Sequence, residues 1–270
     1  MNNIKYYDTH AHLNIEEFNI DVESIIEELK KEKIIINCIA VDIETSKSSI
    51  ELAQKYKNII YACVGIHPTD GWKYKGKVNE TIKELEDLII KNKNIIICLG
   101  EIGLDYYTIY KGSEIDKEFQ QELFRKQLDL AVKYNLPINI HNRDADEDLL
   151  KILKDYKLQK VMIHCFSSNL ESAKKFLERN YILSIPGIVT FKNAKNLHEA
   201  VKEIPLEKMV AETDCPFLTP VPFRGQINKP HYVQYVVKEI AKIKSIDEEE
   251  VRKILLKNSI DFFQIKIDDK

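Results

Sequence analysis

The chain has 270 residues, of which 44 % are hydrophobic and 31 % are charged, and its net charge is −3. The length suits one α/β barrel with a sizeable core, and the charge excludes a global positive field as the means of holding nucleic acid. No apolar run reaches membrane-spanning length, and the start does not resemble a leader, so we expect no membrane association. The five cysteines include no Cys-x-x-Cys pair, which favours buried thiols and a cytoplasmic location.

Short β-rich runs alternate with amphipathic stretches from one end of the chain to the other. The predicted strands lie near residues 4–10, 33–43, 58–67, 94–102, 136–142, 160–167, 181–187 and 208–214. The runs Ile34–Ile36 and Ile95–Ile97 are apolar without alternation, as expected for strands that are covered on both faces.

Helices are predicted between these strands. One covers residues 21–32, and Thr45 or Ser46 is expected to cap the next. The longest covers residues 116–135 and ends before Pro137, because a residue that precedes proline disfavours helical geometry.

This alternation, without a linker or low-complexity segment, predicts a single α/β domain over residues 1–270, a (β/α)8 TIM barrel. A doubly wound open sheet is the alternative, but no Gly-x-Gly-x-x-Gly motif follows any predicted strand. Barrels of this kind carry their active sites at the C-terminal ends of the strands.

Six side chains that can bind a metal stand at the ends of predicted strands, namely His10, His12, Glu101, His141, His164 and Asp214. His10 and His12 alternate along one strand, so both imidazoles point to the same face. Taken singly, His141 and His164 are equally consistent with hydrogen-bonded core residues, and Glu101 with a carboxylate paired to lysine or arginine. Their recurrence at strand ends favours a metal site.

The donors form two groups. One comes from the first and eighth strands (His10, His12, Asp214) and one from the fifth and sixth (His141, His164), with Glu101 of the fourth strand able to reach both. This arrangement predicts two divalent ions about 3.5–4 Å apart. Mixed imidazole and carboxylate ligands suit Zn²⁺, Mn²⁺, Fe or Co and are less specific for Mg²⁺.

Six motifs spread in order along the chain sharpen this prediction: Asp8–Leu13, Gly65–Pro68, Gly100–Tyr106, Ile140–Ala145, Ile163–Ser167 and Glu212–Pro216. With them the sequence resembles the TatD family of metal-dependent deoxyribonucleases, which belong to the amidohydrolase-like barrels. The resemblance implies a TIM barrel and a divalent-metal phosphodiesterase acting on DNA, often as a 3′→5′ exonuclease. It also implies that the six donors are the metal ligands.

Further residues are candidates for binding substrate at the mouth of the barrel. We expect His67 and Arg143 to contact phosphate, although Arg143 also has acidic neighbours in sequence with which it can pair. Tyr106 is a candidate for stacking on a base. Arg224 and Lys229 lie in a long proline-rich loop that we expect to form a wall of the site.

A second basic cluster, Lys73, Lys75 and Lys77, is interpreted as solvated surface.

The favoured mechanism is hydrolysis of a phosphodiester by a metal-activated water, with Asp214, Glu101, His67 and Arg143 as catalytic residues. DNA is the expected partner, with RNA as the alternative and no obligate protein partner. A first rival is a metal-dependent hydrolase of a small amide or ester, or of the acyl bond of an aminoacyl-tRNA. A second is a non-catalytic metal-containing nucleic-acid-binding protein, which the complete donor set disfavours, since structural sites tend to be closed and rich in cysteine.

Overall fold

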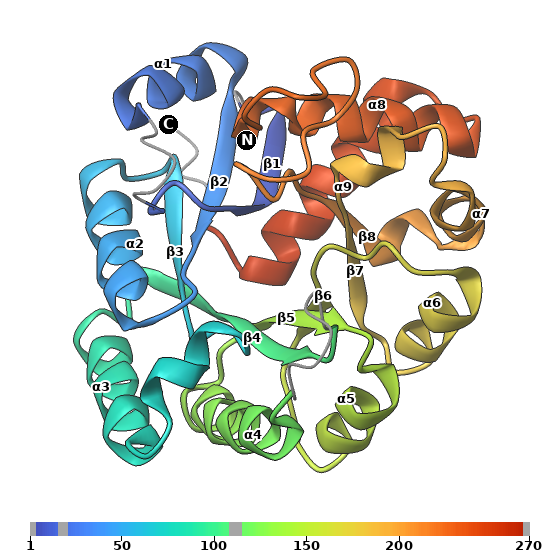
Figure 1. Cartoon of the computed structure of the whole chain (residues 1–270). Helices are drawn as coiled ribbons and strands as arrows, with labels where there is room; N and C mark the ends of the chain where they lie inside the picture. The colour runs from blue at the N-terminus through green and yellow to red at the C-terminus, as the bar shows by residue number, and fades with distance from the viewer. Residues whose placement is uncertain (1–3, 16–20, 108–114, 267–270) are drawn as a thin grey trace.

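Eight parallel strands form one sheet in which each strand pairs with the next along the chain (Figure 1). The computed structural model describes residues 4–15, 21–107 and 115–266. The strands are β1 (Tyr6–Ala11), β2 (Ile34–Ile39), β3 (Ile60–Val64), β4 (Ile96–Asp105), β5 (Ile138–Arg143), β6 (Val161–Ile163), β7 (Ile182–Ile185) and β8 (Met209–Ala211). The predicted TIM barrel is confirmed.

The two ends of this sheet meet just beyond β8. The segment that follows β8 forms a parallel bridge between Cys215 and Ala11, and the backbone N–H of Asp214 donates to the carbonyl of His10 at 2.9 Å. The buried Asp8 carboxylate adds two further links, because it accepts the backbone N–H and the hydroxyl of Thr213 at 2.8 and 2.5 Å. This closure brings the end of β1 beside Asp214.

Helices surround the strands in the alternating order that the sequence predicts (Figure 1). They are α1 (Val22–Glu32), α2 (Ile43–Lys55), α3 (Val78–Lys91), α4 (Lys117–Tyr134), α5 (Asp146–Leu153), α6 (Leu170–Leu177), α7 (Lys195–Glu203), α8 (Val233–Lys244) and α9 (Glu248–Phe263). The predicted cap of α2 is wrong: Asp42 is the N-cap, and Thr45 lies three residues later as the second member of a capping box.

Strand β4 runs three residues beyond its predicted end. Gly103 and Asp105 pair with His141 and Arg143 of β5, so tertiary pairing extends a segment whose glycine and carboxylates suggested a strand end. Gly103 has a φ of +149°, and a Cβ there would lie 1.9 Å from the carbonyl oxygen of His141. Only glycine therefore lets β4 pass this close to the backbone of His141.

Helix α9 covers the end of the barrel at which the strands begin. Its side chains bond to carbonyls just before β1 and at the start of β8, from Arg252 to Lys5 and from Asn258 to Met209. Phe263 packs against Tyr7, with ring centroids 5.7 Å apart. The opposite end, where the strands finish, remains free to carry a site.

No helix within residues 4–15, 21–107 and 115–266 combines the length and the apolar character needed to cross a membrane. Four of the cysteines are buried (Cys38, Cys63, Cys98 and Cys215), Cys165 is partly exposed, and all five are free thiols. The expectation of buried, unbridged thiols therefore holds for four of them.

Candidate metal centre

The first group of donors converges where β1 ends. The Nε2 atoms of His10 and His12 lie 3.1 Å apart. Glu101 Oε2 is 3.3 Å from the first of these nitrogens and 3.7 Å from the second, and Asp214 Oδ1 is 3.7 and 3.4 Å from them. Two imidazole nitrogens and two carboxylate oxygens thus face a common point.

The second group meets the other oxygen of the same glutamate. Glu101 Oε1 lies 2.7 Å from His141 Nδ1 and 2.8 Å from His164 Nε2. The rings of His10 and His164 stack with centroids 3.8 Å apart, which places the two groups side by side. Each oxygen of Glu101 therefore faces one of the two groups, so the carboxylate lies between them, as the strand order suggested.

Three of the four imidazoles in the cluster turn their other nitrogen toward an acceptor. His12 Nδ1 lies 3.1 Å from the carbonyl oxygen of Ile39, His141 Nε2 lies 3.0 Å from Asp105 Oδ2, and His164 Nδ1 lies 3.3 Å from Glu212 Oε1. Each of these outer nitrogens must carry the proton of a neutral ring. The inner nitrogens then offer lone pairs to the centre, which is the form that binds a metal.

The amide of Asn139 completes this pattern at His10. As placed, its Nδ2 lies 3.0 Å from His10 Nδ1, and its buried Oδ1 has no hydrogen-bond partner among the described residues. Exchanging the two amide atoms gives Oδ1 the Nδ1–H of His10 as a donor and frees Nε2 for the cluster. The inner imidazole nitrogens and the carboxylates of Glu101 and Asp214 then all present electron pairs to one small space, which a cation would stabilise. The residues present therefore fit divalent metal ions.

The electrostatics of the cluster favour bound positive charge. Burial alone would raise the pKa of Glu101, but the imidazoles around it, above all His164 and His67, hold that pKa well below its usual range. Burial lowers the pKa of His10. It would also lower the pKa of His164, but the carboxylates of Glu101 and Glu212 outweigh it and raise that pKa well above the usual value. Both shifts have the same cause, because the buried carboxylate and the imidazoles around it stabilise each other's charged forms.

His67 lies against the second group. Its Nε2 is 3.5 Å from Glu101 Oε1, and its ring meets that of His141 edge-on with centroids 4.3 Å apart. Its Nδ1 accepts the backbone N–H of Thr69 at 3.2 Å, so Nε2 carries the proton of the neutral ring. The fold thus places Glu101 beside Nε2, in addition to the local Asp70, whose Oδ2 lies 3.4 Å from Nδ1. A protonated Nε2 suits a donor to substrate rather than a ligand.

Three buried carboxylates at the site were not picked out from the sequence, namely Asp8, Asp105 and Glu212. Asp8 holds the turn that presents Asp214, whose φ of +55° is tolerated better by aspartate than by most residues. Burial raises the pKa of Asp8 well above its usual range, against the hydrogen bonds from Thr213. A signal was available: Asp8 and Glu212 each stand two residues before a predicted ligand, on the same face of an extended segment.

The cluster forms the floor of a cavity of about 1130 Å³. Its walls include His67, Arg143 and Lys73 together with the apolar side chains of Phe217, Leu218 and Ile188. Lys73, interpreted from the sequence as solvated surface, pairs with Asp42 at this wall. The cavity therefore combines cationic and apolar surface above the donors.

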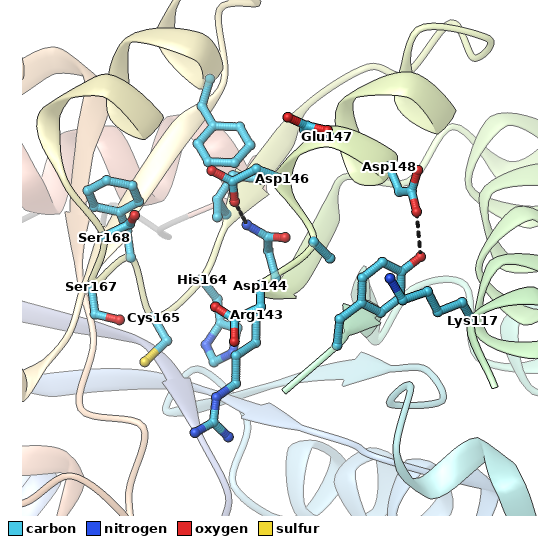
Figure 2. Close-up of a pocket in the computed structure, with 16 residues that line it drawn as sticks. Lys117, Arg143, Asp144, Asp146, Glu147, Asp148, His164, Cys165, Ser167 and Ser168 are labelled. Carbon is cyan, nitrogen blue, oxygen red and sulfur yellow. Dashed lines mark hydrogen bonds between the residues drawn. The ribbon is translucent and has the colours of Figure 1, made fainter. Parts of the chain in front are cut away.

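Arg143 reaches the mouth of this cavity. Its guanidinium lies 3.7 Å from the centroid of the Tyr107 ring. Figure 2 shows the side chain pointing away from Asp146 and Asp148. The guanidinium therefore lies on the Tyr107 ring rather than against these two carboxylates, and its paired N–H donors suit an anion.

A smaller cavity of about 490 Å³ lies beside the first and shares Arg143, His164 and Cys165 with it (Figure 2). Tyr106 lines this side cavity, but its hydroxyl donates to Asp148 Oδ2 at 3.0 Å and Lys117 Nζ lies 4.3 Å from its ring centroid. Tyr107, with 43 % of its surface exposed, is the more accessible ring.

The structure does not bring Arg224 and Lys229 to either cavity. The Arg224 guanidinium lies 4.1 Å from the ring centroid of Phe191 and donates to the carbonyl of Thr219 at 3.3 Å. The late loop (residues 215–230), which carries both side chains, thus packs partly against itself.

Comparison with known proteins gives relatives over nearly the whole chain. Residues 7–264 match a family model described as TatD related DNase. The chain belongs to the TatD family. Its resemblance to that family, which rested on six motifs, is therefore confirmed.

Relatives of this TatD chain are named as metal-dependent hydrolases. A Bacillus subtilis protein, "uncharacterized metal-dependent hydrolase YabD", is 42 % identical over 262 residues, covering 96 % of this chain and 99 % of the relative. Human "deoxyribonuclease TATDN3" is 29 % identical over 261 residues, covering 95 % and 93 %. The crystal structure of YjjV, a TatD homologue from Escherichia coli K12, superposes with a TM-score of 0.88 at 27 % identity, covering 97 % and 99 %.

Proposed function

We propose that this TatD-family chain is a divalent-metal-dependent deoxyribonuclease that removes nucleotides from the 3′ end of single-stranded or frayed DNA. The observation that carries the proposal is the sharing of Glu101 between two imidazole groups, on the floor of a cavity whose walls carry His67 and Arg143. The human relative named as a deoxyribonuclease supports DNA as the substrate class.

His10, His12, Asp214 and Glu101 would hold one ion, and Glu101, His141 and His164 the other. Bound divalent ions supply a Lewis acid that eases deprotonation of water and offsets charge on phosphate oxygens. Their identity is proposed from the ligand set as Mg²⁺, Mn²⁺, Zn²⁺, Fe or Co.

The side chains divide the remaining work. Asp214 lies 13 % exposed at the floor, where its carboxylate can orient the attacking water and accept its proton. His67 donates from Nε2, and Arg143 offers the paired donors that suit a phosphate. Water attacks phosphorus, the bond to the 3′ oxygen of the preceding nucleotide breaks, and a 5′-mononucleotide leaves.

Burial of the donors supports action on chain ends. Glu101 is only 4 % exposed and His10 is fully buried, so the scissile phosphate must descend into the cavity. A flexible single strand or a frayed end can do so, whereas a phosphate within an intact duplex is held at the surface of a wide, stiff rod.

Exposed aromatic rings support binding of unpaired bases. The described part of the chain exposes three aromatic side chains by more than a third, Trp72, Tyr107 and Phe217, and all three follow the C-terminal ends of strands, on the segments after β3, β4 and β8. Stacking on such rings contributes about 1–3 kcal/mol per base and requires an unpaired base. Arg224 and Lys229 are proposed to meet phosphates further along the strand.

The test is digestion of matched oligonucleotides by the metal-loaded protein. A single-stranded DNA labelled at its 5′ end should shorten one nucleotide at a time, while the same strand closed into a circle should survive. Asp214→Asn, purified in parallel, controls for contaminating nucleases. Rapid cutting of the circle would contradict end-directed action.

The same assay separates the rival functions. Faster cleavage of RNA than of DNA would identify RNA as the substrate. Turnover of an aminoacyl-tRNA or a small ester without cleavage of DNA would favour the ester-hydrolase alternative. Binding of DNA without turnover of any substrate would favour the non-catalytic alternative.

A further inference from the structure

The four imidazoles of the metal centre differ in what holds their outer nitrogens. On the β1 side, His12 faces the carbonyl of Ile39 and His10 faces the amide of Asn139, at 3.1 and 3.0 Å. Both of these partners are neutral. On the other side, His141 faces the carboxylate of Asp105 and His164 faces that of Glu212.

Asp105 is fixed against His141. Its Oδ2 lies 3.0 Å from His141 Nε2, while its Oδ1 accepts the backbone N–H of Tyr107 at 2.9 Å. Gln120 of α4 donates to the backbone carbonyl of Asp105 and accepts its N–H, both at 2.8 Å. The carboxylate is 6 % exposed and pairs with no lysine or arginine among the described residues. Both its backbone and its side chain are thus held in place.

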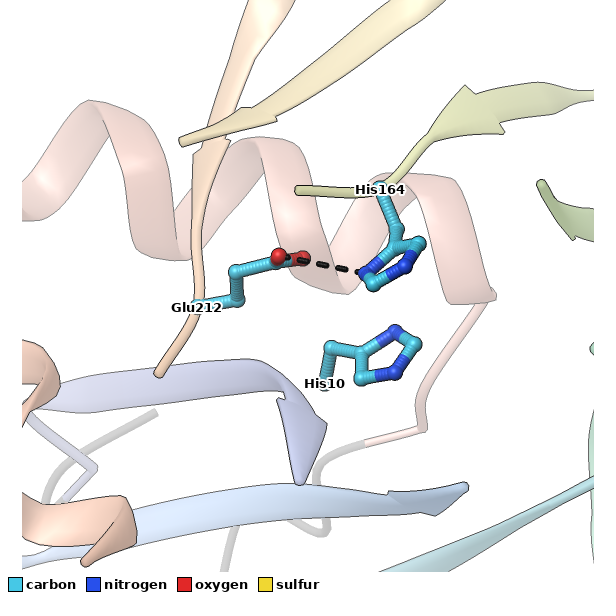
Figure 3. A group of neighbouring side chains, drawn as sticks. All are labelled: His10, His164 and Glu212. Carbon is cyan, nitrogen blue, oxygen red and sulfur yellow. Dashed lines mark hydrogen bonds and ion pairs between the residues drawn. The ribbon is translucent and has the colours of Figure 1, made fainter. Parts of the chain in front are cut away.

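Glu212 is fixed against His164 (Figure 3). It is fully buried, and its Oε1 accepts the backbone N–H of Cys165 at 2.7 Å and lies 3.3 Å from His164 Nδ1. Its Oε2 has no hydrogen-bond partner in the described part of the chain, and no lysine or arginine pairs with it there. Of the imidazoles nearby, His164 is the one that faces this carboxylate at hydrogen-bond distance, while a ring nitrogen of His10 also lies within 4.8 Å of it. Positive charge carried through His164 is therefore its most direct compensation.

We infer that Asp105 and Glu212 are positioning residues for only one of the two ions, the one that His141 and His164 would hold. The inference rests on the two-ion site of the proposed function. A carboxylate that faces the N–H of an imidazole fixes its tautomer and orientation and raises the basicity of the opposite nitrogen. A carbonyl or an amide fixes the ring without adding a charge.

The two ions therefore depend on different supports and leave separately. Loss of either carboxylate weakens the ion at His141 and His164, and the ion at His10, His12 and Asp214 stays. Removal of such an outer partner typically lowers metal affinity about 10- to 100-fold.

Two isosteric variants test this, and they differ in a useful way. In Glu212→Gln the amide oxygen can keep both hydrogen bonds of Oε1, with the NH₂ group in the place of the unpartnered Oε2, so only the charge is lost. In Asp105→Asn one of two donors, the N–H of Tyr107 or that of His141, must face an NH₂ group. The asparagine therefore also opposes the metal-binding tautomer, and its effect should be the larger.

The measurement is calorimetric titration of stripped protein with Co²⁺, with bound metal counted after dialysis. Wild type should bind two ions per chain. Each variant should keep one ion with unchanged affinity and bind the second about 10-fold more weakly in Glu212→Gln and up to about 100-fold more weakly in Asp105→Asn. Asp214→Asn should weaken the ion at His10 and His12, so that the ion at His141 and His164 is bound more tightly in this variant. Adding either substitution to Asp214→Asn should then weaken that tighter ion, which assigns the affected site.

Asp148→Asn is the matched control, because this carboxylate is also partly buried near the site but bonds to Tyr106 and Gln121 instead of an imidazole. It should leave both Co²⁺ affinities unchanged. A single cooperative melting transition of each stripped protein establishes that the variant is folded, and if one variant fails that check the other decides.

Parallel weakening of both ions, or no change in either, would overturn the inference. Two-ion binding without exonuclease activity would contradict the proposed function and leave the inference intact. A wild-type stoichiometry of one would contradict both.

Discussion

The metal centre and the late loop, residues 215–230, differ in how their side chains are placed. The donors of the centre stand at strand ends, where hydrogen bonds between neighbouring segments fix the position of the backbone. The bond from the Asp214 N–H to the His10 carbonyl is an example. The loop carries Arg224, which packs on Phe191, outside both cavities. Position at a strand end thus predicts convergence. Position in the loop does not by itself, because Phe217 and Leu218 reach the wall of the large cavity whereas Arg224 covers a surface elsewhere.

The strongest test of this contrast is Glu101→Ala. Because this carboxylate faces both imidazole groups, its loss should empty both metal sites and lower hydrolysis by about 10³-fold or more, the scale seen when one member of a cooperating set is removed. Metal analysis and initial rates check this. Chelation of the wild type should match the variant, and added Mn²⁺ or Co²⁺ should rescue only the wild type. Turnover by metal-free wild type would show that hydrolysis does not depend on metal ions held at Glu101.

The next effect is expected at the cavity wall, in His67→Ala and Arg143→Ala. Each removes a charge-assisted or neutral donor to phosphate, worth roughly 1.5–3 kcal/mol, so kcat/KM should fall about 10- to 100-fold while metal content stays at the wild-type level. Arg143→Lys is the matched variant, and it should recover only part of the loss because it lacks the paired donors. A metal-depleted His67→Ala protein would move His67 into the ligand set.

A smaller effect concerns the pH dependence of stability in chelated protein. The pKa of His164 is raised by its carboxylate neighbours, so its contribution is complete below about pH 6.5 and is lost as the pH rises through the raised value. The pKa of Glu101 is lowered, so its contribution is lost only as the pH falls through that low value.

The melting temperature of chelated protein should therefore fall between pH 6 and pH 9 by a few degrees, since about 1 kcal/mol corresponds to roughly 2–4 °C in a domain of this size. Protein saturated with Co²⁺ should show the opposite trend, because protons compete with the metal for the imidazoles. A rise with pH in the chelated protein would show that His164 is not the group that carries the proton.

The smallest effect is expected in the late loop. Arg224→Ala and Lys229→Ala should change kcat/KM by about twofold or less, the ~0.5 kcal/mol typical of surface substitutions. Binding of single-stranded DNA by Asp214→Asn should depend weakly on salt, with a slope near −2 if about three phosphates are neutralised. A loss in Arg224→Ala as large as that in Arg143→Ala would erase the distinction between the two regions.

The sequence by itself determined the barrel and brought out the donors. Strand and helix periodicity predicted eight strands, and alternation along β1 predicted that His10 and His12 share a face, where their nitrogens lie 3.1 Å apart. Grouping by strand order also anticipated that Glu101 would lie between the two sets, since parallel strands end at one rim. These features follow from local periodicity and chain topology, which a single sequence carries.

Only the tertiary structure decided the surroundings of the donors. The extension of β4 to Asp105 depends on pairing with β5, and the contact of Glu212 with His164 joins residues 48 positions apart. The stacking of Arg143 on Tyr107, rather than pairing with Asp144 or Asp146, likewise depends on the path of a neighbouring strand. Such contacts are set by side-chain packing between elements distant in sequence, for which local periodicity holds no information.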